Sequence, residues 1–442
     1  MATITPFRGI LYNPEQIGSL ADVVTPPFDI ISPEEQELFY QQHPNNMIRV
    51  ILGKTSPEDT PEDNRHTRAA TSFNQWMNER VLVRDDEPAL YLTSMEFKAR
   101  DTFYTRYGLI ALVKLEPFEK GIVLPHERTF SNVKSERLGL MKACHANFSP
   151  IFALYPDGNR LLTLLQKDVD GQAPVMDFTE ALGFRHRLWR ITDRNLHRQA
   201  TDALQHQKIF IADGHHRYET ALNYRNWVAD TTPGFTDDHP ANFVMMYLCG
   251  MDDPGLIIRS AHRLLKEVPA TALAALPNQA ADYFDIETFD FQPDNLDQVR
   301  AAFFKALNAN ADRNAIGFLA KNTQTFYLLI LKPNTMTRLF GDELADVLLN
   351  IDVTVLTRLI FMELLGFDQK RLDNEKLIGY ATRAKNAVKS VLKGEYDITF
   401  VLNPTRIEQV QAIAEAGLIM PRKATYFFPK VITGQVMNLL TP

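Results

Sequence analysis

Five consecutive residues, Asp213-Gly214-His215-His216-Arg217, separate an apolar β-prone run from a segment with a helical pattern. A strand, a tight glycine turn and a helix start together form an anion site. The turn leaves backbone N–H groups unpaired, and the helix N-terminus carries about half a positive charge. Basic residues are unfavourable in a first helical turn unless an anion lies beside them. The motif therefore predicts that phosphate binds here.

Each residue of this motif has a role that its chemistry suggests. Gly214 would let the backbone approach the phosphate closely, and Arg217 would hold two phosphate oxygens with its planar guanidinium. His215 or His216 would donate to the phosphate, while Asp213 would hold a metal ion or orient that histidine. The alternative is an Asp-Gly turn with solvated basic residues. A zinc site at the two histidines is disfavoured, because adjacent helical residues diverge by about 100° and no Cys or His is spaced to complete it.

A second segment concentrates charged residues upstream of this motif. Lys134 and Arg137 are three residues apart, so they share a helix face and could neutralise phosphate. Glu127 is the best candidate for a general base that deprotonates a hydroxyl, and its neighbour His126 joins the candidate catalytic set. Asn147 could complete the polar group. The alternative is a solvated loop and helix face, the common fate of charge-rich segments.

Three loops supply weaker candidates. Asp29 follows two prolines that stiffen its loop, so it is a second candidate base, although an Asx-type turn explains it equally well. Lys430 follows Pro429 and could reach a phosphate from another part of the chain. Asp252 and Asp253 could bind Mg²⁺, but the Asp-Pro-Gly sequence favours a turn.

The composition is that of an ordinary globular protein of 442 residues, with 45% hydrophobic and 23% charged residues. A net charge of −7 repels nucleic acid and anionic membranes, so a small-molecule substrate is the expected partner. Two cysteines give no disulfide framework. The N-terminus lacks the pattern of a signal peptide, and no apolar run approaches the roughly 18 residues of a membrane span. We therefore expect a cytoplasmic protein.

Periodicity and turn residues predict an α+β fold with a mixed or antiparallel central sheet. Ser32, Pro33 and Glu35 form the sequence pattern of a helix capping box. The other predicted elements are strands at 48–52, 89–97, 105–113, 150–155, 209–213, 243–248 and 397–402, a hairpin at 316–330, and helices at 68–80, 353–365 and 406–416.

The composition shifts at about residue 264, where Ala-rich helices begin to alternate with short strands. We therefore predict a catalytic α+β region at 1–263 and a C-terminal α+β region at 264–442 that could pack back on the site. The role of the C-terminal region does not follow from its sequence.

Several segments resemble the bacterial and archaeal family of unknown function numbered 1015, over essentially the whole chain. These segments are Pro6–Gly9, Thr25–Ser32, His126–Arg137, Ile211–Ala221 and Met251–Leu256. Phe28 departs slightly, since tyrosine is more usual there. The Asp-Gly-His-His-Arg-Tyr segment also resembles the phosphate-binding element of the ParB/sulfiredoxin superfamily, which includes free-serine kinases. Sulfiredoxin chemistry is disfavoured, because His215 stands where sulfiredoxin has its catalytic cysteine.

This resemblance and the motifs together predict a phosphotransferase that acts on a small hydroxylated metabolite, with free L-serine as the leading acceptor. The donor would be ATP, ADP or pyrophosphate, with Mg²⁺. No Walker loop or protein-kinase motif is present. The alternative is a nucleotide-binding switch without turnover, or a ParB-like protein that grips a nucleic-acid backbone.

Overall fold

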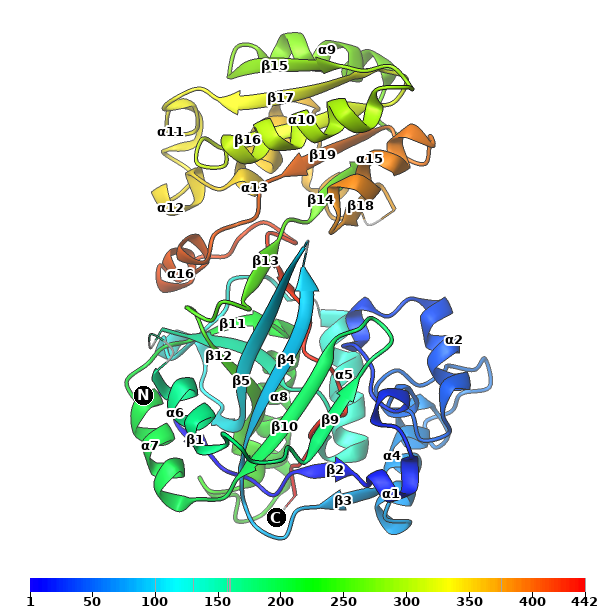
Figure 1. Cartoon of the computed structure of the whole chain (residues 1–442), viewed down its shortest axis with the longest axis vertical. Helices are drawn as coiled ribbons and strands as arrows, with labels where there is room; N and C mark the ends of the chain where they lie inside the picture. The colour runs from blue at the N-terminus through cyan, green and yellow to red at the C-terminus, as the bar shows by residue number, and fades with distance from the viewer. Residues whose placement is uncertain (100, 130, 157, 159, 375, 442) are drawn as a thin grey trace. The chain divides into compact units, whose positions relative to one another are not determined.

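The computed structural model describes all residues except 100, 130, 157, 159, 375 and 442. The chain forms two compact units (Figure 1). The first comprises Met1–Ile257 together with Pro429–Pro442, and the second comprises Ile258–Phe428. The last fourteen residues thus group with the first unit, whereas the sequence prediction assigned 264–442 to one region. Among the described residues, no helix has the length and apolar character that a membrane crossing requires.

The first unit contains a nine-stranded mixed sheet in the order β6-β11-β8-β12-β5-β4-β10-β9, with β1 paired to β5. The pairs β6–β11 and β8–β12 are parallel and the others are antiparallel. The prediction of an α+β fold with a mixed central sheet is therefore confirmed. The strands are β1 Ile4–Thr5, β4 Leu90–Ala99, β5 Thr102–Lys114, β6 Val123–Leu124, β8 Ile151–Tyr155, β9 Met176–Thr179, β10 Arg185–Ile191, β11 Ile209–Asp213 and β12 Phe243–Gly250.

Three helices supply apolar side chains to the main core on one face of this sheet: α6 (Arg160–Asp168), α7 (Arg194–Leu204) and α8 (His215–Thr231). Leu196, Ala200 and Leu204 of α7 are four residues apart, so all three lie on one helix face, and all three are buried. This core fixes the position of α8 against β11, where the polar motif lies.

A second core in the same unit is built from short helices. Helices α3 (Ile48–Ile51), α4 (Arg65–Asn78) and α5 (Ser131–Cys144) supply buried side chains to this core. Helix α2 (Pro33–Gln42) has the predicted capping box and no buried residue. The strand predicted at 48–52 is wrong. The Asn46 side chain accepts the Ile48 N–H at 2.9 Å, and burial of these residues against α4 outweighs their β propensity.

The second unit is an antiparallel six-stranded sheet in the order β15-β17-β16-β19-β14-β18. The predicted hairpin and the predicted helix at 406–416 are confirmed, and residues 353–365 are helical with a π-helical part at Val355–Leu364. The elements are β14 His262–Leu265, α9 Ala270–Ala280, β15 Phe284–Asp290, α10 Leu296–Ala309, β16 Ala315–Ala320, β17 Thr325–Leu331, β18 Ile378–Ala381, α15 Ala384–Leu392, β19 Ile398–Leu402 and α16 Ile407–Glu415.

Gly108 on β5 provides a test of packing within the nine-stranded sheet. A Cβ atom at this position would lie 2.1 Å from the Tyr247 ring of β12, and that ring is buried. We expect Gly108→Ala to lower the free energy of unfolding by about 1–3 kcal/mol, since the ring must move within a packed core. Phe103→Ala on the same strand is the control, because Phe103 is 78% exposed and should change little. Equal stability of the two variants in urea unfolding would contradict this packing.

Candidate functional site

The predicted strand, glycine turn and helix start are all present. β11 ends at Asp213, Gly214 has φ +98°, and α8 begins at His215. A positive φ of this size favours glycine. A Cβ at Gly214 would also lie 2.9 Å from the Arg217 guanidinium, which folds back over the turn. The backbone therefore favours glycine here, and a larger residue would also displace the Arg217 guanidinium.

The carboxylate of Asp213 lies between two cations. Arg217 Nη2 donates to Asp213 Oδ2 at 2.6 Å, and Lys430 Nζ donates to Oδ1. Arg217 Nη1 also donates to the Pro150 carbonyl at 2.5 Å. Burial alone would raise the pKa of Asp213, but the charges of Lys430 and Arg217 outweigh burial and hold it below its usual range. The anion beside Arg217 is thus supplied by the protein itself.

His215 packs against a second, buried histidine. The rings of His126 and His215 meet edge to face at 4.7 Å, and the His126 backbone N–H donates to His215 Nε2 at 3.2 Å. Burial, and next the unfavourable effect of placing a proton beside His126, hold the pKa of His215 well below its usual value, so the ring is neutral. Because Nε2 accepts a hydrogen bond, the ring proton lies on Nδ1, which is 4.0 Å from Glu127 Oε2. His215 therefore faces Glu127, and Nε2 is already engaged by the backbone.

Helix α5 directs its two predicted cations to different places. Lys134 Nζ donates to Glu219 Oε2 of α8 at 2.5 Å. Arg137 Nη1 donates to the Ile51 carbonyl at 2.7 Å, its Nη2 donates to Glu136 at 2.5 Å, and its guanidinium lies 4.1 Å from the centre of the Phe28 ring. Lys134 thus joins two helices, whereas Arg137 is held beside the loop that carries Phe28.

A pocket with a cavity volume of about 60 Å³ brings together Arg137, Asn147 and Arg217 from three separate parts of the sequence. Asn147 Oδ1 accepts the Met245 N–H at 3.3 Å, which leaves the Asn147 amide group as a donor. The other lining residues are Phe28, Ile51, Leu140, Met141, Ala146, Phe148, Ser149, Ile151, Thr220 and Val244. The pocket therefore combines an apolar wall with hydrogen-bond donors, the usual character of a small-molecule site.

The remaining predicted residues lie outside the lining of this pocket. Asp29 is exposed in a 3₁₀ helix, directly after the pocket residue Phe28. His216 is partly exposed, and its backbone carbonyl accepts the Thr220 hydroxyl at 2.6 Å. Sequence reasoning missed Phe28 and Glu136. Phe28 looked like a loop residue, and Glu136 looked like part of a charged helix surface.

The residues around Asp213 do not fit a protein-held Mg²⁺ ion. Both carboxylate oxygens are bound by cations, and no group of three His, Cys, Asp or Glu in the described part of the chain is arranged to hold a metal. Asp253, the other candidate, accepts the backbone N–H groups of Tyr107 at 3.1 Å and Gly255 at 2.7 Å. It therefore has the hydrogen bonds of a turn residue.

Residues 4–354 match the family described as "Protein of unknown function (DUF1015)". A search of curated proteins found no match. Among solved structures, a free serine kinase in complex with AMP is 12% identical and has a TM-score of 0.31, over 69% of this chain and 83% of that one. A conserved hypothetical protein from Pyrococcus furiosus is 12% identical (TM-score 0.34), over 72% and 92%. SbnI from Staphylococcus aureus, truncated at its C-terminus, is 11% identical (TM-score 0.35), over 73% and 86%. TM-scores of this size do not establish a shared fold.

The buried histidine pair predicts that stability falls with acidification. Burial, together with the charge of Lys430, lowers the pKa of His126 to about 4. The unfolded chain takes up this proton below about pH 6.5 and the native protein does not. The free energy of unfolding should therefore decrease as the pH falls from about 6.5 toward 4, by up to ~1.4 kcal/mol per pH unit from this residue.

Urea unfolding at pH 7, 6 and 5 measures this dependence. We expect His126→Gln to be less stable than the unchanged protein at pH 7 but to lose less stability between pH 7 and pH 5. His206→Gln, at an exposed position, serves as the control and should keep the original dependence. If His126→Gln and the unchanged protein lose the same stability over this range, the buried pair does not titrate as the structure implies.

Proposed function

Because this chain belongs to the DUF1015 family, whose description names no activity, we propose a function from its own site. The protein transfers a phosphoryl group from a nucleotide or pyrophosphate to a hydroxyl group of a small metabolite. The pocket at the start of α8 is the donor site in this proposal. Free L-serine is the first acceptor to test, because the Asp-Gly-His-His-Arg-Tyr segment resembles that of free-serine kinases.

One observation carries the proposal: two guanidinium groups line one pocket beside a helix N-terminus. Arginine has five N–H donors. The described contacts use three of them on Arg137 and two on Arg217, so both side chains retain donors for phosphate oxygens. The N-terminal end of α8 adds partial positive charge at the same place. Phosphoryl transfer depends mainly on such positioning and charge stabilisation.

Glu127 is the proposed general base, with the exposed Asp29 as the second candidate. The side chain of Glu127 is 27% exposed, and it faces the neutral His215 ring. In the proposed step, the acceptor hydroxyl oxygen forms a bond to the terminal phosphorus of the donor. The bond from that phosphorus to the leaving phosphate oxygen breaks, and the hydroxyl proton passes to the Glu127 carboxylate. Arg137 and Arg217 offset the charge that develops on the phosphate oxygens.

The first test incubates the purified protein with serine, Mg²⁺ and either ATP, ADP or pyrophosphate, and measures phosphoserine. Product with one donor supports the proposal. Binding of a donor without product, for serine and for other small hydroxylated metabolites, favours a nucleotide-binding switch instead. Binding of nucleic acid whose affinity falls steeply with salt would favour the ParB-like alternative.

Two variants then separate the donor site from the base. Arg217→Ala should weaken donor binding at least tenfold, because a charge-assisted pair of hydrogen bonds is lost, and Arg217→Lys should restore part of it. Glu127→Gln should lower kcat about 10²- to 10⁴-fold with donor affinity nearly unchanged. The exposed Glu119→Gln should match the unchanged protein. Full donor affinity in Arg217→Ala would overturn the phosphate assignment.

A further inference from the structure

We propose that Glu136 is a positioning residue, which fixes the Arg137 guanidinium in the pocket so that it meets an anionic ligand in one orientation. The inference rests on the proposed function, since it concerns how that pocket holds phosphate. Sequence neighbours on a helix diverge by about 100° and do not usually pair. Here Glu136 nevertheless accepts two hydrogen bonds from Arg137, from Nε and from Nη2.

Arg137 is held by three hydrogen bonds and by one aromatic ring. The Glu136 carboxylate binds the edge formed by Nε and Nη2, the Ile51 carbonyl accepts from Nη1 at 2.7 Å, and the Phe28 ring lies 4.1 Å from the guanidinium carbon. Two of the five N–H groups remain. Because the Arg137 guanidinium is already fixed, it loses little conformational entropy when it binds an anion.

Glu136 is itself held by the first turn of α4. Its Oε1 lies 3.1 Å from Arg65 Nη2 and 3.2 Å from His66 Nε2. Burial would raise the pKa of Glu136, but the hydrogen bonds from His66 and Arg137 and the charges of Arg137 and Arg65 lower it to about 2. The carboxylate is therefore charged at neutral pH, and it has more cationic neighbours than it needs for one ion pair.

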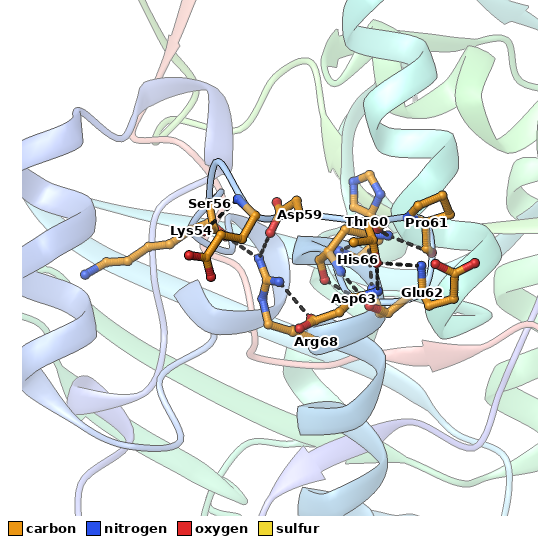
Figure 2. A network of polar contacts seen from close by, with 12 residues as sticks. Lys54, Ser56, Asp59, Thr60, Pro61, Glu62, Asp63, His66 and Arg68 are labelled. Atoms are coloured by element: carbon orange, nitrogen blue, oxygen red, sulfur yellow. Dashed lines mark hydrogen bonds and ion pairs between the residues drawn. The ribbon is translucent and has the colours of Figure 1, made fainter.

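The approach of α4 to α5 is set by a glycine and by a braced loop. A Cβ at Gly139 would lie 2.7 Å from the His66 ring, so this close contact requires glycine. The loop before α4 is braced by Arg68, which donates at 2.8 Å to Asp59 and to Asp63 and at 3.0 Å to the Lys54 carbonyl (Figure 2). The loop thus positions the first turn of α4, the first turn positions Glu136, and Glu136 positions Arg137.

The test measures binding of inorganic pyrophosphate by calorimetry, so it does not require turnover. We expect Glu136→Gln to weaken binding about tenfold, Arg137→Ala to weaken it at least as much, and the double variant to bind no worse than Arg137→Ala. Such non-additivity is expected if Glu136 acts only through Arg137. Glu136→Asp, which keeps the charge, should recover part of the affinity.

Asp177→Asn is the matched control, because Asp177 also forms two hydrogen bonds with one arginine, Arg185, at 2.8 and 2.7 Å. It should leave pyrophosphate binding unchanged. Thermal unfolding of each variant confirms that it is folded. Unchanged affinity in a folded Glu136→Gln, or additive losses in the double variant, would overturn the positioning role. A non-additive cycle in a protein that forms no phosphorylated product would retain this role and reject the proposed function, and an unchanged protein that binds no pyrophosphate would reject both.

Discussion

The ion pair between Asp213 and Arg217 is the interaction on which the rest of the site depends. A carboxylate at the end of a buried strand must be compensated, because an isolated charge is costly to remove from water. Arg217 compensates it by folding back over Gly214, and this fold-back places the guanidinium at the pocket instead of along the helix surface. The bond to the Pro150 carbonyl then fixes its second end. The need to compensate the charge of Asp213 thus explains both the glycine turn and the position of Arg217.

Lys430, from the C-terminal segment, also compensates the charge of Asp213. Its ammonium binds the other oxygen of Asp213, so the last fourteen residues take part in the electrostatics of a turn more than two hundred residues earlier. The same segment is held elsewhere by backbone hydrogen bonds, between Thr433 and Thr25 and between Met437 and Ile10. Asp213 thus joins the start of α8 to the C-terminal segment through two cations.

Sequence patterns were sufficient for features that short-range physics decides. The Ser32 capping box, the strands β4 and β5, and the strand-glycine-helix motif at 209–217 follow from local spacing and turn chemistry, and all are present. The prediction of a strand at 48–52 failed because long-range packing decides the structure there. Their β-branched side chains favour a strand, but a short helix buries them against α4, and tertiary burial outweighed local preference.

The site itself was only partly accessible to such reasoning. Residue types indicated which side chains could bind phosphate, but their partners come from distant segments. The charged run at 126–137 looked uniform in sequence, yet the fold divides it: Lys134 joins α8, Arg137 faces the pocket, and His126 is buried beneath His215. Cations in a first helical turn require a nearby anion, but that anion need not be a ligand. The protein supplies one anion itself, Asp213, so the proposed phosphate site depends on the N–H groups of Arg137 and Arg217 that the described contacts leave unused. Both guanidinium groups line the same pocket, so the proposed ligand would contact particular atoms of Arg137 and Arg217 there.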